Sequence, residues 1–252
     1  MKREVLRPQP KYISMNSMQS VGDRDEQQDY CTYHELYDYI ECDTGCIAAV
    51  ADGMGGYENG GAVAQIAAET FVDRYSTIPR DNVNMALIDS LHAANSAVQG
   101  MGGGSTLVCA AVKNWRLYWI SVGDSRIYLY RNGLLRQLNI EHNYKQKLVK
   151  MVETGEIDVM SAQRHRKRNA LTSYVGMEEI TEYDYNDCEF PLLCGDKILL
   201  CTDGLYRAMK DSEIADAFAF DATACAETAV MRASGKRIRK QDNMTALVVS
   251  ID

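Results

Sequence analysis

Three β-strand patterns follow one another between residues 105 and 131 with only a few residues between them. Residues 105–113, 115–122 and 126–131 are rich in β-branched and aromatic side chains, which favour extended segments. Two parallel strands need a crossover connection of a dozen or more residues, usually one that contains a helix. These connections are too short for that, so the sequence predicts antiparallel sheets.

Further strands are predicted on both sides of this segment. Residues 47–52, 197–202 and 244–251 are short apolar runs, as expected of buried strands. Asn132-Gly133 follows the strand that ends at residue 131 and predicts a tight hairpin, because a type I′ turn requires two positive φ angles.

Two segments between the first strands and residue 105 have helical periodicity. Apolar residues recur on one face from Val63 to Tyr75 and again from Leu87 to Val98. Closely spaced strands with helices inserted in pairs indicate antiparallel sheets covered by helices, which is the α+β class. We expect residues 1–11 to form a loose lead-in and residues 12–252 to form a single domain.

Composition and charge exclude several classes of function. The chain has 27 Lys and Arg against 35 Asp and Glu, and its net charge of −8 is a poor match for duplex nucleic acid. No window approaches 18 consecutive apolar residues, so we expect no membrane span. The basic N-terminal residues are not followed by an apolar segment, which argues against a secretory signal and favours a cytoplasmic location.

The cysteines do not indicate a disulfide framework or a zinc site. Most of the eight lie in apolar runs, where a thiol behaves as a small hydrophobic group, and a cytoplasmic location keeps thiols reduced. Cys42 and Cys46 have the spacing of half a metal site, but the four scattered histidines supply no second half.

Five aspartates stand at the ends of predicted strands or in the turns beside them. Asp and Gly after a strand are usually no more than turn residues. Here several of the positions adjoin apolar strands, and two of the aspartates directly precede a glycine, so a shared function is the better interpretation. In chain order the five are Asp29, Asp52, Asp124, Asp203 and Asp242.

Carboxylates in this arrangement suit hard divalent cations. Mg²⁺ and Mn²⁺ prefer oxygen ligands, and side chains at the ends of rigid strands can converge on one point. A glycine directly after a carboxylate lets the backbone carbonyl approach the same ion. The sequence therefore predicts a divalent-metal centre at one end of the sheets.

Taken together, these stretches resemble the metal-dependent Ser/Thr protein phosphatases of the PPM type, also called type 2C, in their compact bacterial form. The resemblance extends over residues 12–252, and residues 143–175 are similar to the flap segment of that family. Each matching stretch is weak alone, but the set in the family's order is specific. The stretches are Arg24 to Asp29, Asp52-Gly53-Met54-Gly55-Gly56, Gly104-Ser105-Thr106-Leu107, Gly123-Asp124-Ser125-Arg126, Thr202-Asp203-Gly204-Leu205 and Asp242-Asn243-Met244-Thr245.

The resemblance implies a fold and an activity. The family fold is a four-layer α/β/β/α sandwich of two antiparallel sheets flanked by helical pairs. The family hydrolyses phosphoserine and phosphothreonine in proteins with a metal-activated water and without a phosphoenzyme, using two Mn²⁺ or Mg²⁺ ions and, in bacterial members, a weaker third. The implied partners are phosphorylated proteins and a bacterial Ser/Thr kinase whose action the enzyme opposes. We expect a monomer.

Metal-binding roles follow from the resemblance by position. Asp52 would bridge both metals, and the Gly53 carbonyl would bind one of them. Asp203 and Asp242 would hold the other metal. Asp124, together with Asp203, would hold the third.

Four further positions carry a role or depart from the family pattern. Asp29 would orient metal-bound waters from behind the ligands, and Arg24 would clamp the substrate phosphate, a task suited to a planar bidentate donor. Met54 stands where some members have a histidine, and a thioether cannot donate a proton. Gln28 stands where many members have a glutamate, so it is either an uncharged ligand or a residue that only holds a water.

Three alternatives stay open on the sequence alone. Cys201 and Arg207 have the C-x₅-R spacing of cysteine phosphatases, although Asp203 inside that loop would repel a phosphate. A phosphatase-like partner-binding domain without turnover would be expected to have lost a metal carboxylate, and none is missing. A small-molecule phosphomonoesterase would share every catalytic residue.

One basic cluster lies within the flap segment. It could be a solvated face, which is the usual meaning of a charge run. Its position beside the expected active site makes docking of phosphoproteins the competing interpretation. The cluster consists of Arg164, Arg166, Lys167 and Arg168.

Overall fold

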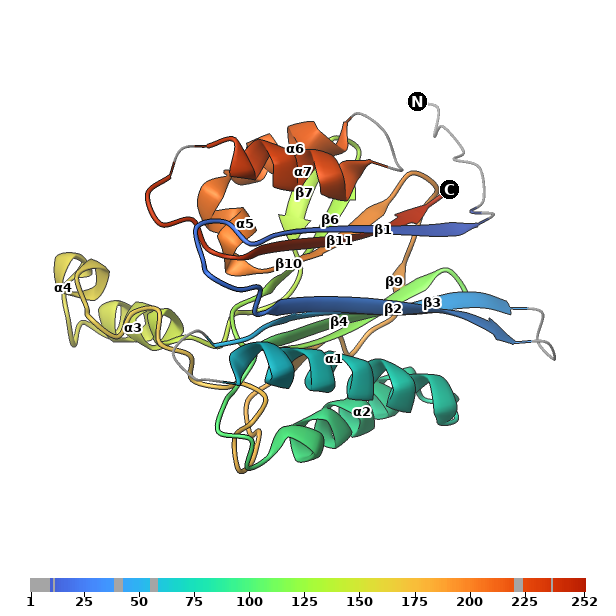
Figure 1. Cartoon of the computed structure of the whole chain (residues 1–252), viewed down its shortest axis with the longest axis horizontal. Helices are drawn as coiled ribbons and strands as arrows, with labels where there is room; N and C mark the ends of the chain where they lie inside the picture. Colours follow the sequence, from blue (N-terminus) through green and yellow to red (C-terminus); the bar gives the residue numbers. More distant parts are fainter. Residues whose placement is uncertain (1–9, 11, 39–42, 55–58, 220–223, 237) are drawn as a thin grey trace.

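The computed structural model describes residues 10, 12–38, 43–54, 59–219, 224–236 and 238–252. Two antiparallel sheets lie face to face in it (Figure 1). The first sheet has the order β1-β11-β10-β6-β7. Its strands are β1 (Ile13–Ser20), β11 (Met244–Ile251), β10 (Lys197–Cys201), β6 (Arg126–Arg131) and β7 (Leu134–Gln137).

The second sheet has the order β2-β3-β4-β5-β8, and β9 also pairs with β5. Every strand pairing in the two sheets is antiparallel within the described residues, as the short connections predicted. Its strands are β2 (Asp29–Asp38), β3 (Asp43–Asp52), β4 (Leu107–Lys113), β5 (Arg116–Val122), β8 (Asp184–Tyr185) and β9 (Phe190–Pro191).

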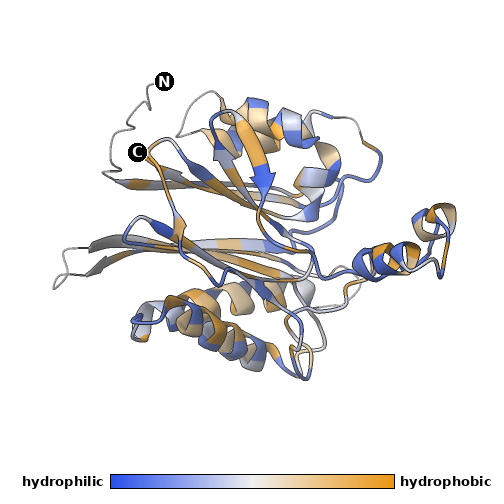
Figure 2. Ribbon diagram, turned by 180° about the vertical axis from the view of Figure 1, so that it is seen from behind, coloured by the Kyte–Doolittle hydropathy of each residue, from blue (hydrophilic) through white to orange (hydrophobic). Residues whose placement is uncertain are grey.

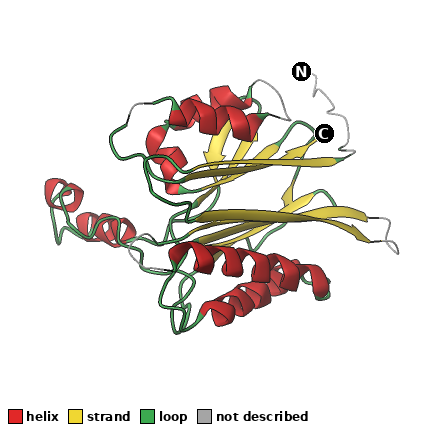
Figure 3. Ribbon diagram, in the orientation of Figure 1, coloured by secondary structure: helices red, strands yellow, loops and turns green. Residues whose placement is uncertain are grey.

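Helices cover the outer face of each sheet (Figure 3). The pair α1 (Gly60–Thr77) and α2 (Val83–Val98) packs on the second sheet. The first sheet is covered by α6 (Asp211–Phe218) and α7 (Cys225–Ser234), and the short helix α5 (Asp203–Ala208) precedes them and packs on the same face. The predicted α+β class and the four-layer α/β/β/α sandwich are confirmed.

The central strands are apolar without alternation because both of their faces are buried. Along β3, Ile47 and Ala49 pack against α1 and α2, whereas Ala48 and Val50 pack in the layer between the two sheets. Side chains of successive strand residues point to opposite faces, so one strand contributes to two cores. The strand β11 is divided in the same way between the core between the sheets and the core under α5 to α7.

Two tight turns have both central residues at positive φ. Asn132 and Gly133 have φ angles of 57° and 80°, which confirms the predicted hairpin between β6 and β7. Asn114 and Trp115 have φ angles of 51° and 57° and make a second such turn between β4 and β5. The strand predicted to begin at residue 115 therefore begins at Arg116, because Trp115 belongs to the turn.

One segment of the chain stands apart from the layers. The helices α3 (Tyr144–Glu153) and α4 (Val159–Gln163) project beyond one end of the sandwich (Figure 1). They lie within the predicted flap segment, residues 143–175.

Some expectations fall outside the described residues. These are the lead-in apart from residue 10, Cys42 of the half zinc site, and Gly55 and Gly56 after Asp52. Within the described residues, the cysteines form no disulfide. In that same part of the chain, no helix is both long enough and apolar enough to cross a membrane.

Candidate metal centre and active site

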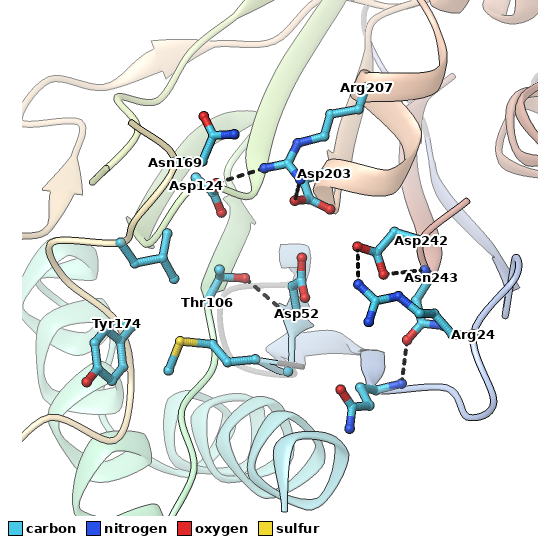
Figure 4. Close-up of a pocket in the computed structure, with 14 residues that line it drawn as sticks. Arg24, Asp52, Thr106, Asp124, Asn169, Tyr174, Asp203, Arg207, Asp242 and Asn243 are labelled. Carbon is cyan, nitrogen blue, oxygen red and sulfur yellow. Dashed lines mark hydrogen bonds and ion pairs between the residues drawn. The ribbon is translucent and has the colours of Figure 1, made fainter. Parts of the chain in front are cut away.

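A cavity of about 420 Å³ lies where the strands carrying the aspartates end (Figure 4). Both sheets contribute to it, because Asp52 ends β3 of the second sheet and Asp242 lies two residues before the start of β11 in the first sheet. The structure thus brings most of the predicted site residues together. Those that line the cavity are Arg24, Gln28, Asp52, Gly53, Asp124, Asp203 and Asp242.

The backbone of Asp52 is fixed by Ser105 and Thr106, the two residues that precede β4. The Asp52 N–H donates to the Thr106 hydroxyl at 3.0 Å, and the Asp52 carbonyl accepts from the Thr106 N–H at 2.9 Å. The Ser105 hydroxyl donates to the same carbonyl at 2.9 Å. The Gly-Ser-Thr-Leu stretch recognised in the sequence therefore positions the Asp52 carboxylate without touching it.

Asp29 lies directly opposite Asp52 in the β2–β3 ladder. Its carboxylate is buried and accepts hydrogen bonds from the hydroxyls of Thr202 and Thr245, each at 2.8 Å. Burial raises the pKa of Asp29 to about 7, although the two threonine hydrogen bonds act against this. Because directly opposed like charges destabilise a sheet, this pair favours a cation or protons nearby.

Arg24 reaches the cavity from the loop before β2. Its Nη2 donates to Asp242 Oδ2 at 2.8 Å, and its side chain is 51% exposed. The loop is tied to the last strand by Asn243, which accepts from the Gln28 N–H at 2.8 Å and donates to the Glu26 carbonyl at 3.0 Å. The fold thus brings Arg24 and Asp242 together although they lie more than 200 positions apart in the chain.

Asp203 is the first residue of α5, and Arg207 lies one turn later on the same helix. Arg207 Nη1 donates to Asp203 Oδ2 at 2.6 Å, and its Nη2 lies 3.8 Å from Asp124 Oδ2. Asp124 reaches this position because residues 123–125 carry the chain from β5 in the second sheet to β6 in the first.

Burial and mutual repulsion control the protonation of these carboxylates. Both effects raise the pKa of Asp52 well above its usual range, with Asp29 and Asp203 as the leading neighbours. Burial, followed by the charge of Asp203, raises the pKa of Asp124 to about 7. Burial also raises the pKa of Asp203, although Arg207 acts against it. A cluster of this kind is stabilised by added positive charge.

Gly53 occupies a position that admits no side chain. A Cβ there would meet the Gln28 carbonyl oxygen at 2.6 Å and the Gly60 carbonyl oxygen closer still. Both obstacles are backbone atoms, so they cannot move aside cheaply. The glycine after Asp52 is therefore required by packing as well as by the proposed approach of its carbonyl to an ion.

The donor set suits divalent cations of the Mg²⁺ or Mn²⁺ type. It offers carboxylate oxygens at strand and helix ends, and burial, followed by mutual repulsion, raises the pKa values of Asp52 and Asp124. Within the described residues, no three acidic or sulfur-bearing groups stand close enough to chelate one ion as they are. Asp203 and Asp242 instead face Arg207 and Arg24, so metal binding has to compete with these ion pairs.

The positions of Cys201 and of the basic cluster bear on two further predictions. Cys201 is fully buried in β10, and burial raises the pKa of its thiol, which contradicts the C-x₅-R interpretation because a nucleophile has to be an accessible thiolate. The basic cluster of the flap does not line the cavity. The flap residues that do are Asn169, Leu171 and Tyr174.

Gln28 turns its amide toward the loop. Its Nε2 donates to Glu26 Oε1 at 2.6 Å, and the residue lines the cavity. Whether it binds a metal stays a prediction.

Sequence reasoning missed several roles in this site, among them those of Arg207 and Asn243. Arg207 was considered only as the arginine of a cysteine-phosphatase loop, although a helix beginning at Asp203 would have set the two residues one turn apart. Asn243 was recognised within a motif but without its function of fastening the Arg24 loop, for which the sequence carries no separate signal.

Comparison with known protein families matches residues 23–239 to the family described as Protein phosphatase 2C. The chain belongs to this family. The predicted family and enzyme class, protein serine/threonine phosphatase, are thereby confirmed, and the interpretation as a partner-binding domain without turnover is not favoured.

Relatives in the family extend over most of the chain. The serine/threonine phosphatase stp of Listeria monocytogenes serotype 4b (strain F2365) is 29% identical over 218 residues, which cover 82% of this chain and 84% of that protein. The S. agalactiae serine/threonine phosphatase structure has a TM-score of 0.79 at 20% identity, covering 96% of this chain and 100% of that one, and supports the fold alone.

A further solved structure bears on the metals. The catalytic domain of the serine/threonine phosphatase PstP was solved in complex with two manganese ions; it has a TM-score of 0.72 at 25% identity and covers 95% of this chain and 99% of that one. Family members are thus similar to this chain in fold, and one of them binds two divalent ions.

Proposed function

We propose that residues 12–252 form one catalytic domain that hydrolyses phosphoserine and phosphothreonine in proteins with two Mn²⁺ or Mg²⁺ ions, opposing a Ser/Thr kinase. The observation that carries the proposal is the convergence of Asp52, Asp203 and Asp242 with Arg24 on one cavity. Few other functions need three carboxylates and a guanidinium on one concave surface.

Each residue has a task that its position supports. Asp52 stands between the two sheets and would contact both ions, with the Gly53 carbonyl beside it. Asp203 and Asp242 would hold one ion from the first sheet. Asp29 is buried, and the hydroxyl of Thr202 fixes its carboxylate by a hydrogen bond. The carboxylate, held in this way, would orient a metal-bound water.

When bound, two divalent ions supply Lewis acidity that lowers the pKa of water and offsets charge on the phosphoryl oxygens. The chain's own residues then bind and orient the substrate. Arg24 is half-exposed on its loop, so its guanidinium can leave Asp242 and take two oxygens of the phosphate. No side-chain nucleophile is required, which agrees with the burial of Cys201.

The experiment is a phosphate-release assay on a phosphothreonine peptide with Mn²⁺, with Mg²⁺ and with chelator. We expect turnover only with metal, and its loss in Asp52→Asn and in Asp203→Asn, because each change removes a negative charge that holds a divalent ion. Turnover that survives chelation would overturn the proposal. A kcat/KM for small aryl phosphates that exceeds the value for phosphopeptides would favour a small-molecule phosphomonoesterase.

We also propose that the basic cluster of the flap recruits phosphoproteins. Arg164, Arg166 and Lys167 are exposed, and the flap helices project from the body of the molecule (Figure 1), while Tyr174 of the same segment lines the cavity. The protein's net charge of −8 repels acidic substrates, but a local positive patch acts within a Debye length of about 8–10 Å. Arg168 adjoins an apolar groove between α3 and α4, whose hydrophobic residues are visible in Figure 2.

Neutralising the four basic residues to glutamine tests this recruitment. We expect a higher KM for a phosphoprotein, a weaker salt dependence, and an unchanged kcat for a small aryl phosphate. Equal phosphoprotein kinetics in the wild type and the variant would leave the cluster as a solvated face. The matched control neutralises four exposed arginines outside the flap, Arg74, Arg136, Arg232 and Arg239.

A further inference from the structure

The Arg207 guanidinium bridges two carboxylates of the cavity. One of its nitrogens lies 2.6 Å from Asp203 Oδ2 and the other lies 3.8 Å from Asp124 Oδ2 (Figure 4). The side chains of Asp203 and Asp124 are only 13% and 8% exposed. These are the two carboxylates that the family resemblance assigns to a third metal ion.

The helix that carries Arg207 and the contacts of Asp124 position the two sides of this bridge. It shares α5 with Asp203, so the helix fixes their separation at one turn. On the other side, the Tyr206 hydroxyl donates to the Asp124 carbonyl at 3.0 Å. The Arg126 guanidinium lies 3.7 Å from the centre of the Tyr206 ring and ion-pairs with Glu141 at 2.6 Å.

The second arginine of the cavity is held differently. Arg24 lies on a loop and ion-pairs with Asp242; its side chain is 51% exposed, close to the 48% of Arg207, so the two arginines differ in the element that carries them and not in exposure. No helix connects Arg24 to its partner, so a divalent ion can displace it without disturbing an element. We therefore expect added metal to displace Arg24 from Asp242 but to leave Arg207 beside Asp203.

A third divalent ion does not fit beside Arg207. An ion at about 2.1 Å from the Asp203 oxygen that Arg207 contacts would lie less than about 5 Å from the guanidinium nitrogen. The two negative charges of Asp124 and Asp203 would then face three positive charges, one from Arg207 and two from the ion. This surplus of positive charge is poorly screened because both carboxylates are buried. Asp203 keeps Oδ1 for the two-metal centre, because a carboxylate offers two oxygens.

We propose that the Arg207 guanidinium takes the place of a third metal ion between Asp124 and Asp203, so that this phosphatase contains two divalent ions and one internal cation. The proposal rests on the two-metal function proposed above. It makes Arg207 a positioning residue that fixes Asp203 for its role in the centre, and it removes Asp124 from the metal ligands.

Counting bound metal tests the proposal without reference to turnover. Chelator-treated wild type, Arg207→Asn and Arg207→Lys are titrated calorimetrically with Mn²⁺ up to about 10 mM, beyond the weak end of oxygen-ligand sites. We expect two sites in the wild type and in Arg207→Lys, which keeps the charge, and a third site in Arg207→Asn. Asp124→Asn added to Arg207→Asn should remove the third site again.

Mn²⁺-soaked crystals locate the same ions by anomalous scattering. We expect a peak between Asp124 and Asp203 in Arg207→Asn and none there in the wild type. A third ion at that position in the wild type overturns the proposal, as does an Arg207→Asn variant that remains folded and gains no site. A wild type that binds no Mn²⁺ at all refutes the two-metal function itself, which is a different outcome. The melting temperature of each variant in chelator verifies that it is folded.

Discussion

Replacing Asp52 by asparagine should stabilise the metal-free protein and at the same time destroy metal binding. Asp52 faces Asp29 across the β2–β3 ladder, and neither carboxylate has an arginine partner among the described ion pairs. The amide keeps the size of the side chain and removes one of the two opposed charges. The site is therefore expected to trade stability for function at this position.

The magnitude follows from the repulsion that is removed. Directly opposed strand residues have Cβ atoms about 5 Å apart, and two unit charges about 5–7 Å apart repel by about 2–3 kcal/mol at an effective dielectric constant of about 20. For a chain of this length, 1 kcal/mol corresponds to about 2–4 °C in Tm. We therefore expect Asp52→Asn to raise Tm by about 4–12 °C in chelator, at an alkaline pH at which both carboxylates, whose pKa values are raised, are ionised.

In saturating Mn²⁺, the wild type should have the higher Tm and Asp52→Asn the lower one. A ligand at a hundred times its Kd stabilises the folded state by about 2.7 kcal/mol per site, and the variant forfeits this stabilisation at the centre that Asp52 would bridge. Thermal melts of both proteins with chelator and with saturating Mn²⁺ measure the crossover. The matched control is Asp216→Asn on the exposed side of α6, which should change Tm little in either condition.

One outcome would refute this reasoning. If Asp52→Asn lowered Tm in chelator as much as it does in Mn²⁺, the carboxylate would be stabilising the fold, and its repulsion by Asp29 would not be the dominant interaction.

Three further predictions concern single positions. Gly53→Ala should lower kcat/KM at saturating Mn²⁺ by more than tenfold and stability by about 1–3 kcal/mol, because the new Cβ would collide with backbone oxygens; steady-state kinetics and thermal melts check both. Cys201→Ser should lose about 1–3 kcal/mol for burying a hydroxyl but keep kcat within about twofold, and abolished turnover in the folded variant would restore the thiolate mechanism. The pKa of about 7 for Asp29 exceeds the value of about 3.9 in an unfolded chain, so the folded protein retains a proton that the unfolded chain has lost. This stabilisation is complete below about pH 4 and is lost as the pH rises through 7, so melts in chelator should show a decline across this window that Asp29→Asn flattens.

Much of the fold was predictable because local patterns and tertiary structure agree. Residues 197–202 and 244–251 are apolar on both faces, and the sandwich buries both faces of β10 and β11. The aspartates could be located because each adjoins a strand, and strand ends in a layered fold converge at its edges. The turn at Asn114 and Trp115 could not be predicted, because neither residue is a glycine and the positive φ angles are imposed by the pairing of β4 with β5.

The parts of the site that sequence reasoning missed depend on contacts between distant segments. The threonines that hold Asp29 come from the ends of two other strands, and nothing in their own neighbourhoods indicates a carboxylate partner. The ion pair of Arg207 with Asp124 could not be predicted without knowing that the chain passes from one sheet to the other at residues 123–125. The sequence thus indicated which side chains form the site, whereas the way these side chains pair depends on the assembled sandwich.

The position of β11 in the first sheet limits when activity can arise during synthesis. This strand is the last in chain order, yet it lies between β1 and β10 and pairs with both. At about 5–20 residues per second, a ribosome produces β11 more than ten seconds after β1, and until then β1 has no partner in its sheet. A nascent chain can pair β2 to β5 early, but it carries only the Asp52 half of the metal centre. Translation arrested before Asp242 should therefore release fragments without phosphatase activity, so incomplete synthesis cannot produce an unregulated enzyme.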